Sequence, residues 1–215
     1  MTVLPQLLQA KIVAIIRGVR PDAVLPVAEA LYRGGIRALE LTLNSERALE
    51  VLRALSDRMG DRLLVGAGTV LDAAAASDAL DAGAQFIIAP SVDAETIRLT
   101  RERGAVSIPG AYTPTEILTA WRAGADLIKV FPASSPQYLR DLAGPLGHIP
   151  MMPTGGVTLE NIGAFRQAGA VAFGVGSALV DTKKEMTSEA LDDLTRKAAR
   201  FVAAVHPEGT PAEHS

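Results

Sequence analysis

The sequence predicts an α/β protein built as a single (β/α)8 barrel, also called a TIM barrel, with a short N-terminal helix. Three observations predict it: β-branched apolar runs recur, segments of helical spacing alternate with them, and glycines stand where each helix passes into a strand. With 215 residues, the chain suits one domain and lies near this barrel's lower limit of about 200 residues. The eight strand candidates are residues 12–18, 38–43, 63–70, 85–90, 105–111, 127–132, 151–156 and 171–177.

Helical segments lie between these strand candidates. Apolar residues recur at helical spacing in segments such as 22–35, 46–60, 93–104 and 159–169. Glycine can take the left-handed conformation that ends a helix, so small residues at the joins mark where each helix stops. These joins are Gly34–Gly35, Ala82–Gly83–Ala84, Gly104–Ala105, Gly124–Ala125 and Gly169–Ala170. Each strand and helix unit spans about 20–25 residues, and eight such units close a barrel.

The two ends of the chain lie outside this repeat. The segment around Leu4–Gln9 is expected to form a short helix that covers the bottom of the barrel. We expect one domain over residues 1–205 and a disordered tail over residues 206–215, which are mostly polar. An open doubly wound sheet is the alternative, but residues 66–68 lack the third glycine of a dinucleotide fingerprint.

Composition excludes several classes of function. Hydrophobic residues make up 48% of the chain and aromatic residues 4%, so the core must consist of Ala, Val, Ile and Leu, as in buried parallel strands. A formal net charge of −3 without a Lys or Arg run argues against a nucleic-acid partner. The absence of cysteine excludes disulfides and thiol catalysis. No signal peptide or run of ~20 apolar residues is present, so we expect a soluble, cytoplasmic protein without a membrane partner.

Lys129 is the first candidate catalytic residue. In the strand candidate LIKVFP, Leu127, Lys129 and Phe131 share one face, while the two β-branched residues between them suit the side packed on helices. Lys129 therefore points into the barrel, where loss of hydration would lower its pKa and produce an amine nucleophile. A structural lysine paired with a carboxylate is the alternative.

Glu40 has the same kind of position. In ALELTLNS, the residues Ala38, Glu40, Thr42 and Asn44 share one face and three leucines share the other. A carboxylate inside the barrel near a lysine could transfer protons during carbinolamine formation and dehydration. A plain salt bridge to Lys129 or Arg17 would give the same pattern.

Arg17 and Thr69 end the first and third strand candidates, at the carboxyl end where barrel active sites form. A guanidinium there can bind a carboxylate through two hydrogen bonds, so Arg17 is the candidate for holding a pyruvyl carboxylate. The alternatives are a solvent-exposed loop arginine for Arg17 and a helix N-cap for Thr69.

Two glycine-rich segments indicate a phosphate site. Residues 153–156 (PTGG) and 174–177 (GVGS) follow or end the seventh and eighth strand candidates, where phosphorylated ligands are commonly held in barrels by backbone N–H groups. Glycines that allow close packing are the alternative. The histidines, His148, His206 and His214, are scattered along the chain, and no set of metal ligands can be assembled, so we expect no metal and no cofactor.

Seven motifs taken together resemble the 2-keto-3-deoxy-6-phosphogluconate (KDPG)/4-hydroxy-2-oxoglutarate (KHG) aldolase family from about residue 5 to residue 205. They are AIIRG, ELTLNS, VGAGTVL, SIPGAYTPTE, IKVFPAS, PTGGV and GVGSALV. The resemblance implies a homotrimeric barrel, a Schiff-base lysine at Lys129 and an acid–base glutamate at Glu40. It also implies that Thr69 and Arg17 bind the carboxylate and that Phe131 packs beside the imine. Gly155, Gly156 and Ser177 are implied to hold the distal phosphate.

Two positions bear on the substrate. The gluconate-cleaving branch of the family often has arginine four residues after the glutamate, whereas this chain has Asn44, as in the related phosphogalactonate aldolases. Arg17 could supply the missing cation. Thr154 and Ala133 resemble the gluconate branch, and the hydroxyl of Thr154 could recognise the C4 hydroxyl of the substrate.

The sequence thus predicts a class I aldolase that cleaves 2-dehydro-3-deoxy-6-phosphogluconate into pyruvate and glyceraldehyde 3-phosphate, with 4-hydroxy-2-oxoglutarate as a further candidate substrate. Cleavage of the phosphogalactonate epimer is one alternative. Others are a phosphosugar isomerase or epimerase that uses a carboxylate base without a covalent lysine, and a non-catalytic ligand-binding barrel.

Overall fold

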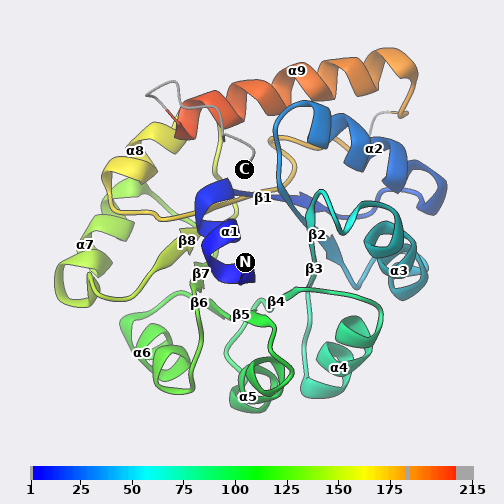
Figure 1. Ribbon diagram of the computed structural model, residues 1–215. Helices are drawn as coiled ribbons and strands as arrows, with labels where there is room; N and C mark the ends of the chain where they lie inside the picture. The colour runs from blue at the N-terminus through cyan, green and yellow to red at the C-terminus, as the bar shows by residue number, and fades with distance from the viewer. Residues whose placement is uncertain (1, 183–184, 207–215) are drawn as a thin grey trace.

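The computed structural model describes residues 2–182 and 185–206. Its helices are α1 (Val3–Ala10), α2 (Pro21–Arg33), α3 (Ala48–Met59), α4 (Ala73–Asp81), α5 (Ala94–Glu102), α6 (Pro114–Arg122), α7 (Pro136–Leu146), α8 (Ile162–Gln167) and α9 (Ser188–Val205). Its strands are β1 (Ile12–Ile16), β2 (Ala38–Thr42), β3 (Leu64–Gly68), β4 (Phe86–Ile88), β5 (Val106–Ile108), β6 (Gly110–Ala111), β7 (Ile128–Val130), β8 (Met151–Pro153) and β9 (Phe173–Val175). Helix α1 lies over the centre of the strands, and the other helices surround them (Figure 1).

The paired strands of the described residues are all parallel and form two sheets, in the orders β5-β4-β3-β2-β1-β9 and β6-β7-β8. Each predicted strand segment contains a strand. The fifth is divided between the sheets at Pro109, which has no N–H to donate to a ladder. An isolated bridge between Thr154 and Gly174 links the sheets again. The predicted parallel α/β fold is confirmed. In place of the predicted single eight-stranded ring, the structure has two sheets, which meet at Pro109 and at the bridge between Thr154 and Gly174.

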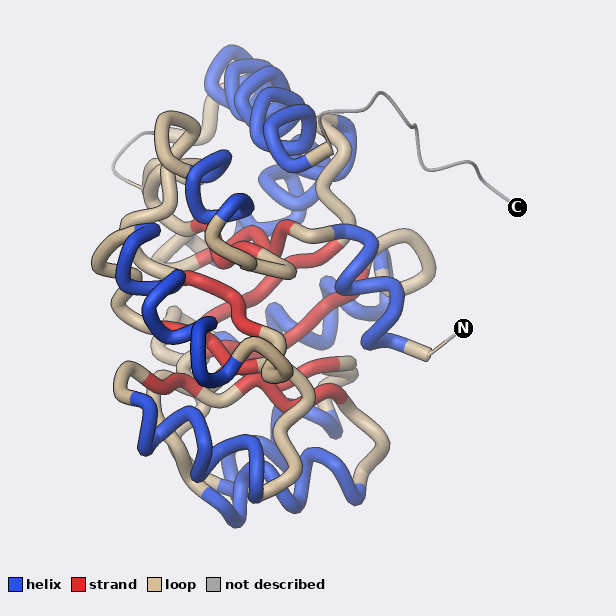
Figure 2. The backbone as a smooth tube through the Cα atoms, turned by 90° about the vertical axis from the view of Figure 1, so that its left-hand side faces the viewer, coloured by secondary structure: helices blue, strands red, loops and turns tan. Residues whose placement is uncertain are grey.

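The ends of the helices follow from local sequence. Glycines at the predicted joins have left-handed backbones, with φ from +76° to +99°, at Gly35, Gly83, Gly104, Gly124 and Gly169. Side chains accept a hydrogen bond from the first helical turn at Asp72, Asp93, Thr113, Ser135 and Thr187. These start and stop signals set the length of the helices that cover the strands (Figure 2).

Alternate residues of the strands belong to two different apolar clusters. The larger cluster packs strands against the surrounding helices and includes Ile128 and Val130 of β7. The smaller one joins residues from strands of both sheets to Leu7 of α1, and it includes Ala38 of β2 and Leu127, which directly precedes β7. Since this smaller cluster brings together strands that are far apart in the sheet order, it marks their shared inner face. The predicted alternation in β2 and β7 is therefore confirmed.

The N-terminal helix seals one end of this inner face. The sequence predicted a short helix around Leu4–Gln9, and α1 has fully buried Leu7 in contact with the inner cluster. The predicted disordered tail, residues 206–215, lies outside the described residues except for His206. Among the helices of the described residues, none combines the length and apolar character needed to span a membrane.

Candidate active site

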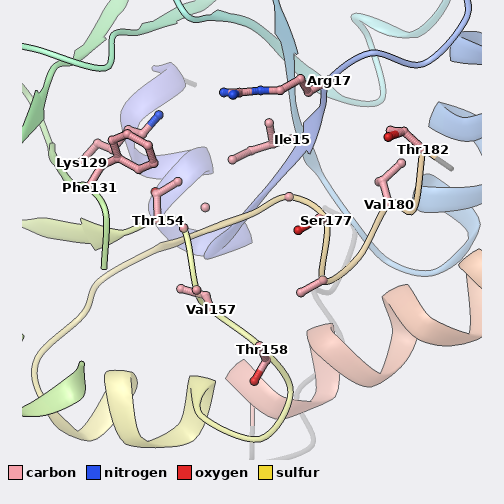
Figure 3. A pocket seen from close by; sticks show the side chains of 15 residues that line it. Ile15, Arg17, Lys129, Phe131, Thr154, Val157, Thr158, Ser177, Val180 and Thr182 are labelled. Carbon is pink, nitrogen blue, oxygen red and sulfur yellow. The ribbon is translucent and has the colours of Figure 1, made fainter. Parts of the chain in front are cut away.

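A cavity of about 460 Å³ opens at the carboxyl ends of β1, β7, β8 and β9. It is lined by Ile15, Arg17, Lys129, Phe131, Thr154, Gly155, Gly156, Val157, Thr158, Gly174, Gly176, Ser177, Ala178, Val180 and Thr182. In Figure 3, Arg17 extends toward the side that carries Lys129 and Phe131, while Ser177 lies on the side of Val180 and Thr182. The lining includes the residues predicted for the site except Glu40 and Thr69, each of which lies next to it.

Lys129 lies in the middle of β7 on the inner face, and its side chain is almost fully buried. Its Nζ lies 4.8 Å from the centre of the Phe131 ring. Burial lowers the pKa of Lys129 because the charged ammonium loses hydration; the nearby Glu40 opposes this shift, and the charge of Arg17 adds to it. A larger fraction of the amine is therefore neutral near pH 7 than for a lysine in water, and a neutral amine is the nucleophile that attacks a ketone.

Glu40 lies in the middle of β2 and is completely buried. Burial raises its pKa, and the charges of Lys129 and Arg17 only partly oppose that shift. Among the described residues, neither carboxylate oxygen of Glu40 has a hydrogen-bond partner. Within the same residues, Glu40 forms no ion pair with Lys129 or Arg17. A buried polar group without a partner is costly, so it indicates a group that is held for a ligand or a proton.

Two glycines of β3 make room on the inner face. A Cβ atom added at Gly68 would collide with Oε1 of Glu40, and one added at Gly66 would overlap the ring of Phe86. In the register of the parallel strands, Glu40 pairs with Gly66, and Thr42 pairs with Gly68. Gly68 therefore leaves the space that the carboxyl group of Glu40 occupies, and Gly66 leaves the space for the ring of Phe86.

Arg17 follows β1, and its Nη2 donates a hydrogen bond of 3.3 Å to Oγ1 of Thr69. Thr69 has a left-handed backbone with φ of 55°, which is rare for a β-branched residue and marks a position under local constraint. The alternative role of Thr69 as the cap of α4 is wrong, because Asp72 caps that helix. Among the described residues, Arg17 forms no ion pair with a carboxylate, so its positive charge is available to an anion.

The opposite side of the cavity is formed by backbone. Gly155 and Gly156 both have left-handed φ angles, of +77° and +95°. Gly156, Ser177 and Ala178 all line the cavity. Among the described residues, the backbone N–H groups of these three donate no hydrogen bond. Free N–H groups from two neighbouring loops are suited to the oxygens of a phosphate. After β9 the chain forms a short turn, in which the backbone N–H groups of Leu179 and Val180 donate to the carbonyl of Gly176.

Thr154 lies between the two sides of the cavity. It is buried, and its hydroxyl makes only a long hydrogen bond of 3.4 Å to the carbonyl of Met152. Gly174, its bridge partner on β9, has no side chain, and a Cβ atom there would collide with Oγ1 of Thr154. The Thr154 hydroxyl therefore keeps hydrogen-bonding capacity toward the cavity.

Sequence reasoning missed part of the lining, namely Ile15, Val157, Thr158, Ala178, Val180 and Thr182. The same alternation that placed Lys129 could have identified Ile15, which shares its strand face with Arg17. Nothing local distinguishes the other residues, which come together only through the fold. Groups of three His, Cys, Asp or Glu residues with metal-ligand geometry do not occur in the described part of the chain.

Comparison with known proteins adds independent findings. The family model for KDPG and KHG aldolases matches residues 3–196. The 2-dehydro-3-deoxy-6-phosphogalactonate aldolase of Escherichia coli is 36% identical over 196 residues, covering 90% of this chain and 93% of that protein. The 2-dehydro-3-deoxy-phosphogluconate aldolase of Pseudomonas aeruginosa is 38% identical over 157 residues, covering 72% and 71%. The native KDPGal structure aligns with a TM-score of 0.84 and 36% identity, covering 91% of this chain and 94% of that one.

Proposed function

Because the chain belongs to the KDPG and KHG aldolase family, and is thus a carbon–carbon lyase, we propose that it cleaves a phosphorylated 2-keto-3-deoxy sugar acid through a Schiff base on Lys129. Family membership leaves no reason to retain the isomerase, epimerase or non-catalytic alternatives. The observation that carries the proposal is the pair of buried groups on the inner face, Lys129 and Glu40, whose charges affect each other without forming an ion pair.

In the proposed reaction, the neutral amine of Lys129 attacks the C2 carbonyl carbon of the substrate, and Glu40 supplies the proton with which the carbonyl oxygen leaves as water. The resulting iminium accepts the electron pair of the C3–C4 bond as that bond breaks, and the C4 hydroxyl gives its proton to the carboxylate of Glu40. The aldehyde then departs. Glu40 returns this proton to C3 of the enamine, and hydrolysis of the iminium by water releases pyruvate, restores the amine of Lys129 and gives a proton back to Glu40.

The two sides of the cavity fit the two ends of such a substrate. Arg17, hydrogen-bonded to Thr69 and without an ion pair among the described residues, is suited to the carboxylate next to the reacting carbon. The free N–H groups of Gly156 and Ser177, together with the exposed Ser177 hydroxyl, are suited to the distal phosphate. Phe131 packs against the amine that forms the imine. These assignments follow the predicted roles of the same residues.

We propose phosphogluconate as the preferred substrate, on the basis of Thr154, a hydroxyl-bearing residue that lines the same cavity as Lys129. A hydroxyl can bond to a C4 hydroxyl of one configuration and leaves an unpaired group with the other. Asn44 and the similarity to the Escherichia coli phosphogalactonate aldolase favour the epimer as the second candidate. 4-Hydroxy-2-oxoglutarate, which has no phosphate, remains a third.

We also propose that the two sheets act as one closed ring. The bridge between Thr154 and Gly174 supports this, as does the separation of β5 and β6 by Pro109 alone. A homotrimer and a cytoplasmic location remain predictions from the resemblance and from the sequence.

Treatment with pyruvate and borohydride tests the mechanism, because borohydride reduces an imine to a stable secondary amine. We expect pyruvate-dependent labelling at Lys129, located by peptide mass spectrometry. Labelling elsewhere, or none, would exclude the proposed nucleophile. Comparison of kcat/KM for retro-aldol cleavage of the two phosphorylated epimers and 4-hydroxy-2-oxoglutarate then decides the substrate.

A further inference from the structure

Two hydroxyl groups at the end of β2 form a short hydrogen-bonded chain to the end of β1. The backbone N–H of Gly18 donates to Oγ of Ser45 at 3.0 Å, and the hydroxyls of Ser45 and Thr42 lie 3.0 Å apart. The Thr42 hydroxyl donates to the carbonyl of Ile16 at 3.5 Å. A single assignment of protons satisfies all these contacts: Gly18 N–H to Ser45, Ser45 O–H to Thr42, and Thr42 O–H to Ile16.

The chain begins and ends on the two neighbours of Arg17. Ile16 is the last residue of β1, and Gly18 has a left-handed φ of +67°, with open space where a side chain would lie. At Gly18, therefore, little side-chain packing holds the backbone, and the bond to Ser45 takes the place of packing. Thr42 is completely buried at the end of β2, so the chain is anchored to a rigid strand.

The side chain of Arg17 is held at its other end as well. Its Nη2 donates to Thr69, which directly follows β3, the strand beyond β2. Arg17 therefore crosses the end of β2, with its backbone fixed by the hydroxyls of Thr42 and Ser45 and its guanidinium fixed by Thr69. A long arginine side chain loses much rotational freedom when it binds a ligand, and fixing it beforehand reduces that cost.

We infer that Ser45, acting with Thr42, is a positioning residue that holds Arg17 ready for the substrate carboxylate. This inference rests on the proposed function of the cavity. Ser45 is not among the residues that line the cavity, and its effect passes through the backbone of residues 16–18. The inference also bears on Asn44. This chain lacks a cation at position 44, and the next residue, Ser45, instead holds the cation of Arg17 in place.

A purely structural role for these hydroxyls predicts a different outcome. Ser45 N also donates to the carbonyl of Thr42, so the hydroxyls could serve only to stabilise that turn. In that case Ser45→Ala would lower the melting temperature and leave pyruvate binding unchanged. A positioning role predicts weaker binding of the carboxylate that depends on the presence of Arg17.

The test measures the pyruvate concentration that gives half-maximal borohydride labelling of Lys129 in four proteins: the wild type, Ser45→Ala, Arg17→Met and the double variant. We expect Ser45→Ala to raise this concentration about tenfold, the size expected for a lost hydrogen bond to a group that binds a charge. Arg17→Met should raise it at least as much, and adding Ser45→Ala to it should have no further effect, because the positioned group is already gone. Ser45→Thr should restore wild-type binding.

Ser56→Ala is the matched control, since the Ser56 hydroxyl also donates to a backbone carbonyl, that of Gly83, far from the cavity. It should leave the half-maximal concentration unchanged. If Ser45→Ala does not fold, Thr42→Val breaks the same chain and should give the same Arg17-dependent loss. An unchanged half-maximal concentration, or an equal loss with and without Arg17, would overturn the inference. A wild type that pyruvate does not label would instead overturn the proposed function.

Discussion

Leu127, just before β7, and Lys129, within β7, are two residues apart and face the same interior, yet their surroundings differ completely. Leu127 belongs to the inner apolar cluster, which Leu7 of α1 closes. Lys129 lies one step nearer the carboxyl end and faces the cavity. On β2, Ala38 and Glu40 show the same change. At one end of the interior enclosed by the strands, apolar side chains fill the space, whereas at the other end polar side chains lie at a cavity.

Glycines have different neighbours in the two regions. Toward the apolar end, the space left by Gly66 is filled by the ring of Phe86. Toward the cavity, the spaces left by Gly68 and Gly174 are taken by Glu40 and Thr154. The apolar end therefore supplies packing energy, which offsets the cost of a buried carboxyl group that has no hydrogen-bond partner among the described residues. Mutations in the two regions should accordingly affect different measurements.

The largest effect is expected at Lys129. Lys129→Arg should abolish pyruvate-dependent borohydride labelling and aldol cleavage, because a guanidinium stays protonated and cannot act as the nucleophile. Lys129→Met, which removes the charge and fits a similar volume, controls for the greater bulk of arginine. Either variant, if folded and still labelled, would show that the chemistry does not depend on Lys129.

Glu40→Gln should give the next largest effect. The change keeps the size of the side chain but removes its acid–base function, so kcat should fall about 10²–10⁴-fold, with imine formation slow but measurable. The melting temperature should stay near that of the wild type, because Glu40 has no ion pair to lose within the described residues. A stability loss of about 3–5 kcal/mol would instead indicate a buried charge pair.

The same variant makes a pH prediction. Ionised Glu40 raises the pKa of Lys129 against the dominant effect of burial, so removal of its charge lowers that pKa further. The neutral amine then persists to lower pH, and the acid limb of the labelling-rate profile should move to lower pH in Glu40→Gln. A limb that moves to higher pH would contradict the assigned interaction.

Leu127→Ala tests the apolar end, directly before the strand that carries Lys129. Removal of this fully buried side chain should cost about 2–5 kcal/mol of unfolding free energy, while kcat and KM change little. Ile128→Val on the outer face of β7 is the control, expected to cost about 0.5–1.5 kcal/mol. If Leu127→Ala alters labelling as strongly as it alters stability, the two regions are not separable.

Much of this organisation could be predicted from the sequence because it depends on local signals. Alternation placed Lys129 and Glu40 on inner faces, and glycine positions marked the joins between helices and strands. The division at Pro109 was also visible as a proline within a strand pattern, although its consequence for sheet pairing was not.

The remainder depends on residues that meet only in three dimensions. Arg17, Thr42, Ser45 and Thr69 lie on three successive strand ends, and no spacing in the sequence shows that a hydroxyl of one loop bonds the backbone of another. The lack of a partner for Glu40 likewise follows from the placement of every neighbouring group. The trimer and the location of the protein in the cell stay predictions.

The smallest effect is expected at the phosphate side of the cavity. The exposed hydroxyl of Ser177 lies beside backbone N–H groups that have no partner among the described residues, so we propose it as one of several donors to a phosphate. Ser177→Ala should raise KM for a phosphorylated substrate by about tenfold, the lower range for a hydrogen bond to a charged group, and leave kcat nearly unchanged. KM for 4-hydroxy-2-oxoglutarate should not change. Ser77→Ala, which removes a surface hydroxyl bonded to Arg103, controls for general effects. An equal rise in KM for both substrates would show that Ser177 acts on the reacting end of the cavity, and the division of the cavity into a carboxylate side and a phosphate side would then be wrong.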